Sequence, residues 1–263
     1  MGDSIFQICN LSFDVSDMSR KPIIGAAPKL QILKDITINI KRGDVVGIVG
    51  GSGSGKSTLG RVMLRLLEPS KGKIYFNDID ITHLTESQLR PFRRKFQMIF
   101  QDPMSSLNPR HRVNGIIGGP LKLQGFQDID VLINQALDHV GLSLDFKSRY
   151  PHELSGGQRQ RISIARALSS EPEVIVCDEP TSALDVSVQA QVLNLLKALQ
   201  KEYALTYLFI THDLAVVSTM ANKIGVLNKG KLVEEQSPTG LFSRPQQDYT
   251  KMLLNSAPSI NFG

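Results

Sequence analysis

The chain has 263 residues, 41% of them hydrophobic and 21% charged, with a formal net charge of +5. This length and balance predict an ordinary soluble globular protein with a packed core, built as one large domain or two modest ones. The mildly basic charge is typical of a solvated surface of mixed sign, and no Lys/Arg block indicates a nucleic-acid partner.

Two cysteines, Cys9 and Cys177, lie in apolar, strand-like runs. They indicate buried thiols in a reducing compartment rather than a disulfide or a metal site. Residues 1–6 lack the regions of a signal peptide, Phe6 breaks the myristoylation pattern, and no apolar run approaches the roughly 18 residues of a membrane span. We therefore expect a cytoplasmic protein whose association with a membrane comes through a partner.

The N-terminal part of the chain is dominated by apolar runs and alternating patterns that predict strands. The alternation is clear where Ile36, Ile38 and Ile40 fall on one face. Strands are predicted at residues 6–15, 32–40, 45–49, 73–81 and 96–100, with a loop at 16–30, a turn at 42–44 and a helix at 59–67.

The pattern changes from Pro103 to about Ser148, where little strand character remains. Residues 103–168 are therefore predicted to form a mostly helical insertion. Its apolar residues at helical spacing are Val131, Leu132, Ala136, Leu137 and Val140.

The strand pattern resumes at residues 174–177 and again at residues 207–210, each a continuous apolar run. Between them lies an amphipathic helix at residues 187–200, and residues 224–236 are predicted to form a hairpin. Two short helical segments end the chain. Buried strands that alternate with helices predict an α/β fold with a largely parallel core sheet.

A glycine-rich segment joins the strand at residues 45–49 to the following helix. A strand, a Gly-x4-Gly-Lys-Ser turn and a helix start are the context of a phosphate-binding loop, because glycines let backbone N–H groups face a phosphate. Lys56 can reach the terminal phosphates, and the Ser57 hydroxyl can ligate magnesium. The alternative is a turn that merely joins strand to helix. The residues of the predicted loop are Gly50, Gly51, Ser52, Gly53, Ser54, Gly55, Lys56, Ser57 and Thr58.

Two acidic residues, Asp178 and Glu179, follow the apolar run at residues 174–177. Phosphoryl chemistry needs magnesium and an oriented water. Asp178 is placed to hold magnesium beside the phosphate loop, directly or through water, and Glu179 can act as the base or the orienter of the attacking water. The alternative is an acidic pair that caps a strand before Pro180.

Two further polar side chains follow predicted strands. His212 comes after residues 207–210 and can hydrogen-bond the γ-phosphate, since ligands collect at this edge of an open α/β sheet. Gln101 comes after residues 96–100 and can reach magnesium or the water. Taken alone, a structural histidine and a surface amide explain them as well.

The segment Leu154-Ser155-Gly156-Gly157-Gln158 precedes a predicted helix at residues 158–168. It is a second small-residue turn that opens a helix, and therefore a second place where an anion can bind. Because the phosphate loop cradles its own nucleotide, this site can serve a nucleotide held by another subunit. The alternative is an N-cap at Ser155 with flexible glycines.

Together these motifs resemble those of the ATP-binding subunits of ABC transporters, and the resemblance covers essentially the whole chain. The matched segments are Walker A at residues 50–57, the Q-loop at Gln101, the signature at residues 154–158, Walker B at residues 174–178, the catalytic Glu179, the D-loop at residues 182–185 and the switch His212.

The family implies a head-to-tail dimer with two ATP molecules between the Walker residues of one subunit and the signature of the other. Phe13 resembles the aromatic that stacks on adenine, although a buried strand residue is the alternative. Asp185 belongs to the implied nucleotide site. The signature residues implied to hold the partner's γ-phosphate are Ser155, Gly156, Gly157 and Gln158, and the implied Mg²⁺ ligands are Ser57, Gln101 and Asp178.

The same resemblance implies one nucleotide-binding domain of the P-loop ABC ATPase type, with a mostly parallel core sheet and an antiparallel β subdomain. Its implied parts are a RecA-like core at residues 1–102 and 169–240, a helical subdomain at 103–168 and a C-terminal helical extension at 241–263.

A narrower resemblance is to the ATPases of dipeptide, oligopeptide and nickel importers. The residues that carry it are 97–103, 106–110, 150–153 and 213–217, with Pro245, Tyr249-Thr250, Leu253 and Pro258 in the tail. The chain departs from the usual pattern at Gln247-Asp248, Gly51 and Ser54, and neither Gly51 nor Ser54 should impair phosphate binding. Because no cysteine follows Cys177, the iron–sulfur cluster of some relatives is not expected.

The resemblance implies an ATPase subunit that drives uptake of small peptides or nickel complexes through separate membrane-spanning permease subunits. The subunit would lie at the cytoplasmic face of the membrane, paired with an identical chain or a paralogue, and an extracytoplasmic substrate-binding protein would deliver the cargo. The alternatives are a soluble ABC-type ATPase acting on ribosomes or DNA, the ATPase of an exporter, and a P-loop kinase. The kinase reading leaves residues 154–158 unexplained.

Overall fold

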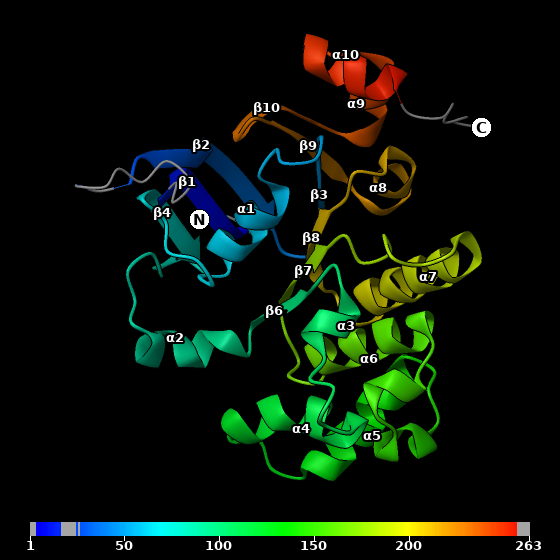
Figure 1. The fold of residues 1–263 in the computed structure, drawn as a ribbon. Coiled ribbons are helices and arrows are strands. Elements are labelled where there is room, and N and C mark those ends of the chain that lie inside the picture. Colours follow the sequence, from blue (N-terminus) through cyan, green and yellow to red (C-terminus); the bar gives the residue numbers. More distant parts are fainter. Residues whose placement is uncertain (1–3, 17–24, 26, 257–263) are drawn as a thin grey trace. The chain divides into compact units, whose positions relative to one another are not determined.

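The computed structural model describes residues 4–16, 25 and 27–256 (Figure 1). They form an α/β fold with one antiparallel sheet and one mixed sheet of mostly parallel strands. The chain divides into two compact units. The first comprises the described residues up to Thr85 and from Leu208 onward, and the second comprises Glu86–Tyr207. Pro258 of the predicted tail motif and most of the predicted loop at 16–30 lie outside the described residues.

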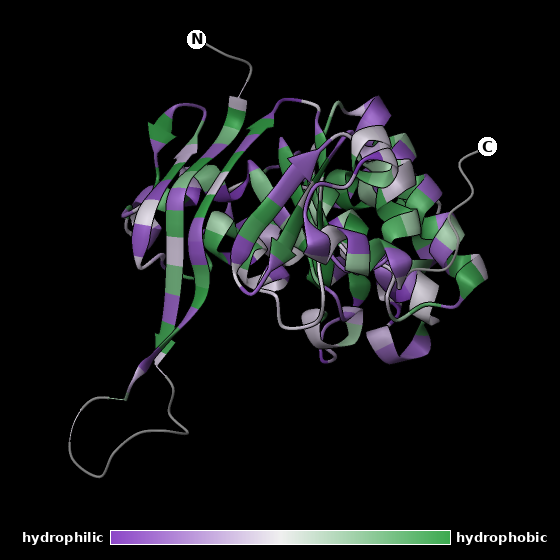
Figure 2. Cartoon of the chain, turned by 90° about the horizontal axis from the view of Figure 1, so that it is seen from above, coloured by the Kyte–Doolittle hydropathy of each residue, from purple (hydrophilic) through white to green (hydrophobic). Residues whose placement is uncertain are grey.

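The first unit contains an antiparallel sheet with the strand order β2, β1, β4 and β5. Exposed and buried residues alternate along β2, and Figure 2 shows purple and green bands alternating along the long strands of the molecule. The rings of Phe6 and Phe76 pack across this sheet with centroids 5.0 Å apart. The strands are β1 (Ser4–Ser16), β2 (Lys29–Lys41), β4 (Lys71–Phe76) and β5 (Ile79–Asp80), which confirms the strands predicted in these regions.

The first unit also contains β3 (Val45–Val49), which pairs in parallel with β9 (Lys223–Asn228). β10 (Lys231–Gln236) returns antiparallel to β9. Lys229 and Gly230 at the turn have φ values of 45° and 82°. Two successive left-handed residues give the twist of a tight hairpin, and the predicted hairpin is confirmed.

The helices described in the first unit are α1 (Lys56–Met63), α8 (Leu214–Met220), α9 (Pro238–Ser243) and α10 (Asp248–Asn255). The prediction of a helix at residues 59–67 was wrong at both ends. The helix ends early because Arg65 adopts a left-handed conformation, with φ of 55°. Its buried guanidinium donates to the carbonyl oxygens of Ile81 and Leu84, which holds the chain in this turn.

In the second unit, β6 (Phe96–Ile99) pairs in parallel with β7 (Val174–Asp178). The chain between them is mostly helical, as predicted. The helices of this unit are α2 (Glu86–Arg93), α3 (Pro103–Ser106), α4 (Val113–Leu123), α5 (Ile129–His139), α6 (Gly156–Leu168) and α7 (Val186–Glu202), with 3₁₀ turns at Leu144–Ser148 and Pro151–Glu153. β8 (Thr206–Ile210) leads back into the first unit. α2 escaped prediction because Leu89 is its one buried residue.

The apolar stripe of α5 is rotated from the predicted one. Val131 is 53% exposed, whereas Ile133 is buried together with Ala136, Leu137 and Val140. These buried positions are spaced three, four and seven residues from Ile133, which is the spacing of one helix face. Val131, which the spacing groups with the apolar residues of this helix, therefore lies outside its buried face.

The two cysteines differ in burial. Cys177 is buried in β7, and this burial raises the pKa of its thiol. Cys9 is half-buried between Ile8 and Asn10 on β1, so the prediction of a buried thiol was wrong for Cys9. Among the residues that the structure describes, no helix has both the length and the apolar character needed to cross a bilayer.

Candidate functional site

The phosphate loop joins β3 to α1 in the first unit. Gly53 and Gly55 have φ values of 72° and 105°, a region in which glycine is favoured. A Cβ at Gly55 would also lie 3.0 Å from Leu33 Cδ2 on β2. Gly55 precedes the first helical residue, so α1 begins at Lys56 and its N–H groups face the loop.

The side chain of Lys56 folds back over this loop. Lys56 is only 6% exposed, and its Nζ donates to the carbonyl oxygens of Gly50 at 2.8 Å and Gly51 at 3.0 Å. A buried ammonium needs such partners, because desolvation of a charge is costly. The loop therefore holds a positive charge at the position where phosphate oxygens would enter.

The hydroxyl of Ser54 lies in the same loop. Ser54 is 5% exposed, and its Oγ has no hydrogen-bond partner among the described residues. A buried polar group left unsatisfied costs about 1–3 kcal/mol, which a phosphate oxygen would relieve. A Cβ added to Gly53 would meet nothing within 4 Å, so there is room beside the loop. The residues present fit a bound phosphate group.

Phe13 lies on β1 in the first unit, where it pairs with Leu33 of β2. It is half-buried, not enclosed in the core. Leu33 in turn approaches Gly55 of the phosphate loop. The structure thus places Phe13, as a half-buried residue, one strand away from the loop.

His212 is exposed and lies between the end of β8 at Ile210 and the start of α8. The amide of Thr211 donates to the carbonyl oxygen of Ile48 at 3.2 Å, so this part of the chain runs beside the end of β3. Asp213 caps α8 by accepting from two backbone N–H groups. His212 therefore leaves the sheet at the edge where the phosphate loop begins.

Gln101 and Glu179 meet in the second unit. The register of β6 and β7 pairs Ile99 with Cys177, so the residues two positions further on leave the sheet at one edge. Gln101 Nε2 donates to Glu179 Oε2 at 2.9 Å. The structure thus brings together two residues that the sequence predicted separately.

Asp178 is the last residue of β7 and is 1% exposed. Glu179 follows in a left-handed conformation, with φ of 45°. Its carbonyl oxygen accepts from the Ser182 hydroxyl at 3.1 Å and from the Ser182 amide at 3.3 Å. This turn carries the chain sharply out of the strand immediately after Asp178.

Asp185 begins α7. Its Oδ1 accepts from the Val188 amide at 2.9 Å and from the Ser187 hydroxyl at 2.7 Å. Both hydrogen bonds lower the pKa of Asp185, and the one from Val188 has the larger effect. The carboxylate therefore stabilises the N-terminus of its own helix.

The signature segment begins α6. Ser155 Oγ accepts from the Gln158 amide at 3.2 Å, and the Ser155 amide donates to Gln158 Oε1 at 2.9 Å. The N-cap proposed for Ser155 is thus present. A Cβ at Gly157 would lie 2.6 Å from Val188 Cγ1, so Gly157 is required for the close packing of α6 against α7. No local sequence pattern indicates this packing requirement.

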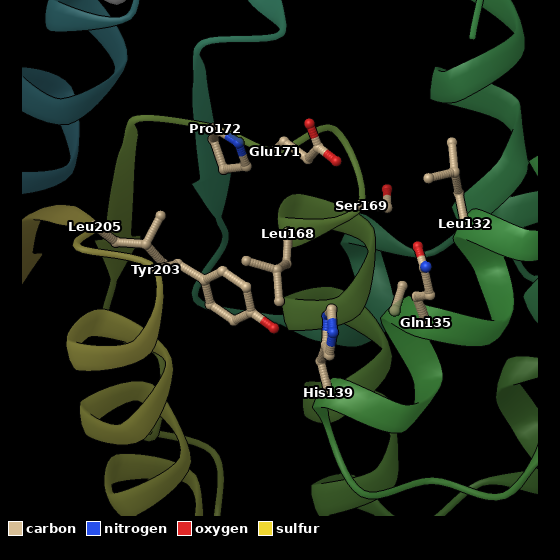
Figure 3. Close-up of a pocket in the computed structure, with 10 residues that line it drawn as sticks. Leu132, Gln135, His139, Leu168, Ser169, Glu171, Pro172, Tyr203 and Leu205 are labelled. Atoms are coloured by element: carbon tan, nitrogen blue, oxygen red, sulfur yellow. The ribbon is translucent and has the colours of Figure 1, made fainter. Parts of the chain in front are cut away.

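The second unit contains a cavity of about 290 Å³ (Figure 3). Leu132 and His139 of α5 and Leu168 of α6 line it, together with Tyr203 beyond α7. The rings of His139 and Tyr203 have centroids 5.2 Å apart. None of the predicted nucleotide-site residues lines this cavity.

One contact with the phosphate loop was missed. The amide of Gly51 donates to the hydroxyl oxygen of Tyr249 on α10 at 2.9 Å. The two residues are 198 positions apart, so no local pattern connects them. The sequence places Tyr249 in the tail motif and indicates no role for it.

The chain is similar to known proteins over most of its length. A profile described as "ABC transporter" matches residues 33–182. The putative oligopeptide transport ATP-binding protein YkfD of Bacillus subtilis is 48% identical over 249 residues, which cover 93% of this chain and 76% of YkfD. The putative peptide import ATP-binding protein BOV_A0347 of Brucella ovis is 50% identical over 88% of this chain and 74% of its own.

Solved structures agree with these relatives. The dimeric ATP-binding cassette MJ0796, in a post-hydrolysis state bound to ADP and Pi, is 30% identical with a TM-score of 0.78. The match covers 89% of this chain and 98% of MJ0796. The predicted α/β fold class is thereby confirmed, as is the resemblance on which the site was assigned. The chain belongs to the ABC transporter family, as one of its ATP-binding and ATP-hydrolysing subunits.

Proposed function

We propose that the chain hydrolyses ATP to power the import of small peptides through separate permease subunits. The phosphate loop carries the ATP-binding part of the proposal, because it offers the buried ammonium of Lys56 and the unsatisfied hydroxyl of Ser54. The proposal that the cargo is a peptide rests on the relatives, whose names describe oligopeptide transport and peptide import.

The first unit binds the nucleotide. Backbone N–H groups within residues 50–58, other than that of Gly51, donate to the phosphate oxygens, as do those at the start of α1. Lys56 exchanges its bonds to the Gly50 and Gly51 carbonyl oxygens for bonds to phosphate. Phe13 stacks on the adenine, which suits its half-buried position, and the exposed imidazole of His212 bonds the γ-phosphate.

The second unit supplies the base. Glu179 takes a proton from the attacking water, and Gln101 orients its carboxylate through the 2.9 Å hydrogen bond. When bound, Mg²⁺ neutralises charge that develops on the phosphates. Ser57, Asp178 and Gln101 each offer the kind of oxygen ligand that Mg²⁺ prefers.

The signature serves a second ATPase subunit, either an identical chain or a paralogue. Ser155, Gly156, Gly157 and Gln158 hold the γ-phosphate of the nucleotide bound by that subunit, and Asp185 lies in the same proposed site. MJ0796, which this chain resembles, is dimeric. The chain attaches to the cytoplasmic face of the membrane through its permeases, and an extracytoplasmic binding protein delivers the cargo.

The proposed domain has a RecA-like core at residues 1–102 and 169–240. The helical subdomain at 103–168 and the region of Gln101 transmit the ATP-driven motion to the permeases. The C-terminal extension covers residues 241–263.

The test is transport by the assembled complex. The chain is co-expressed with its permease subunits, reconstituted in vesicles with the binding protein, and supplied with ATP and, in parallel assays, a labelled peptide or a labelled nickel complex. We expect ATP-dependent peptide accumulation, which a matched complex carrying Glu179→Gln should lack. Accumulation of nickel instead of peptide would refute the proposed peptide cargo. ATP hydrolysis without uptake of either would refute the proposed import function.

A further inference from the structure

Tyr249 reaches the phosphate loop from the C-terminal end of the described chain. It lies in the first turn of α10, is half-buried, and accepts a hydrogen bond from the Gly51 amide at 2.9 Å. Contact is close, because a Cβ at Gly51 would lie 3.2 Å from the Tyr249 hydroxyl. A residue far away in the sequence thus fixes one peptide group of the loop.

Several hydrogen bonds of the phosphate loop meet at Gly51. Its carbonyl oxygen accepts from Lys56 Nζ at 3.0 Å and from the Ser54 amide at 3.2 Å. Its N–H is held by Tyr249. Any movement of Gly51 would therefore shift the carbonyl oxygen to which the Lys56 ammonium is bonded. It would shift the backbone of Ser54 as well.

The chain on either side of Tyr249 is held by a buried carboxylate on β10. Glu234 is 7% exposed and accepts from the amides of Gln246 at 2.8 Å and Gln247 at 3.1 Å. It also accepts a hydrogen bond from the hydroxyl of Thr250, the residue that follows Tyr249. β10 pairs with β9, and β9 pairs with β3, the strand that leads into the phosphate loop. Residues 234–250 thus form a closed path from the sheet back to the loop, which we call the C-terminal brace.

We propose that Tyr249 is a positioning residue for the phosphate loop, and that the C-terminal brace sets the affinity of the loop for ATP. The proposal rests on the ATP-binding role given to residues 50–58 above. Tyr249 acts through Gly51 and does not touch the reacting atoms.

The physical basis is preorganisation. A loop that already holds its binding conformation loses little freedom when the ligand arrives. Without the Tyr249 hydroxyl the loop would also populate conformations that do not bind ATP. The apparent affinity for ATP falls in proportion to the fraction of loops that hold the binding conformation. One neutral hydrogen bond of ordinary strength corresponds to an effect of about three- to tenfold.

The first experiment removes one hydroxyl from the full-length chain. Tyr249→Phe should raise the Kd for a fluorescent ATP analogue about three- to tenfold. In the assembled complex it should raise KM for ATP with little change in kcat, since only binding is affected. Tyr75→Phe, the same change on β4 of the same unit, should bind as the native chain does. Native affinity in Tyr249→Phe would overturn the proposal.

The second experiment tests the contact itself. Gly51→Ala places a methyl group against the Tyr249 hydroxyl, so it should weaken ATP binding in the native background and much less in Tyr249→Phe. Strictly additive effects on ATP affinity in this double-mutant cycle would show that the contact between Gly51 and Tyr249 does not influence binding. This conclusion would hold even if Tyr249→Phe were less stable. Lys56→Ala separates the two proposals. If it abolishes binding while Tyr249→Phe is neutral, only the brace is refuted, whereas normal binding by Lys56→Ala refutes the loop assignment itself.

Discussion

Glu179 occupies a left-handed backbone conformation directly after the buried Asp178. This conformation costs a non-glycine residue about 1–2 kcal/mol and persists where the surroundings fix it. Ser182 holds the carbonyl oxygen of Glu179, and Gln101 holds its carboxylate. The carboxylate is therefore oriented before any nucleotide arrives, as a base should be.

Replacing Glu179, the proposed base, should separate binding from hydrolysis. We expect Glu179→Gln to bind ATP with native affinity and to hydrolyse it about a hundred- to ten-thousandfold more slowly, because an amide cannot accept the proton. Phosphate release gives the rate, and equilibrium titration gives the affinity. Glu202→Gln changes an exposed carboxylate of the same unit and should keep the native rate. Native turnover in Glu179→Gln would exclude Glu179 as the base.

Removal of the loop ammonium should act on binding instead. Lys56→Ala should weaken ATP binding by about tenfold or more, since hydrogen bonds to charged groups contribute about 1.5–3 kcal/mol. Titration with a fluorescent ATP analogue measures the change. Lys71→Ala removes an exposed ammonium on β4 and should have no effect. Unchanged affinity in Lys56→Ala would argue against residues 50–58 as the site.

At the level of elements, the packing of α6 on α7 depends on Gly157. A Cβ there would lie 2.6 Å from Val188 Cγ1, so overpacking should cost about 1–3 kcal/mol, partly offset by the helix propensity of alanine. We expect Gly157→Ala to lower the urea midpoint of unfolding. Gly119→Ala on α4, where nothing lies within 4 Å, should raise it. Adding Val188→Ala should restore much of the loss, and failure to do so would contradict the packing account.

The C-terminal brace should respond to acid. Burial would raise the pKa of Glu234, but the hydrogen bonds from Gln246, Thr250, Gln247 and Gln236 outweigh it, so the pKa lies below its ordinary value of 4.5. A carboxyl with a lowered pKa stabilises the fold above its unfolded pKa and ceases to do so as pH falls through the folded value. Below about pH 4.5, hydrogen exchange should therefore speed up in α10 before it does in β3. Glu234→Gln should remove this pH dependence, and a pH response that survives the substitution would assign it elsewhere.

Local patterns predicted the elements well and their ends poorly. The strand, turn and helix around Lys56 are close in sequence, so residue types alone indicated a phosphate loop. The end of α1 depends on the buried guanidinium of Arg65 and its distant carbonyl partners, which periodicity cannot reveal. The same holds for Tyr249, whose contact with Gly51 spans 198 positions. Spacing likewise suggested a role for Gly157 in anion binding, but its packing against Val188 needed the structure.

For the whole molecule, the decisive property is that the signature of one subunit should complete the site of another. We expect the isolated chain to bind ATP but to hydrolyse it slowly, with a rate per chain that rises with protein concentration. Phosphate release measured over a hundredfold range of dilution tests this, with Glu179→Gln as the background. A rate per chain that does not change with concentration would contradict a shared site.

The turn of the β9–β10 hairpin limits how this protein can be labelled. Hairpin tips are common places for an inserted epitope or fluorophore, because surface turns tolerate extra residues. Here the Gly230 amide donates to the Ser54 carbonyl oxygen at 2.9 Å, and the Lys34 amide donates to the Gly230 carbonyl oxygen at 2.8 Å. An insertion at this tip would disturb β2 and the phosphate loop together, and nucleotide affinity would report it. The exposed turn at Gly125, between α4 and α5, is the safer place for a label.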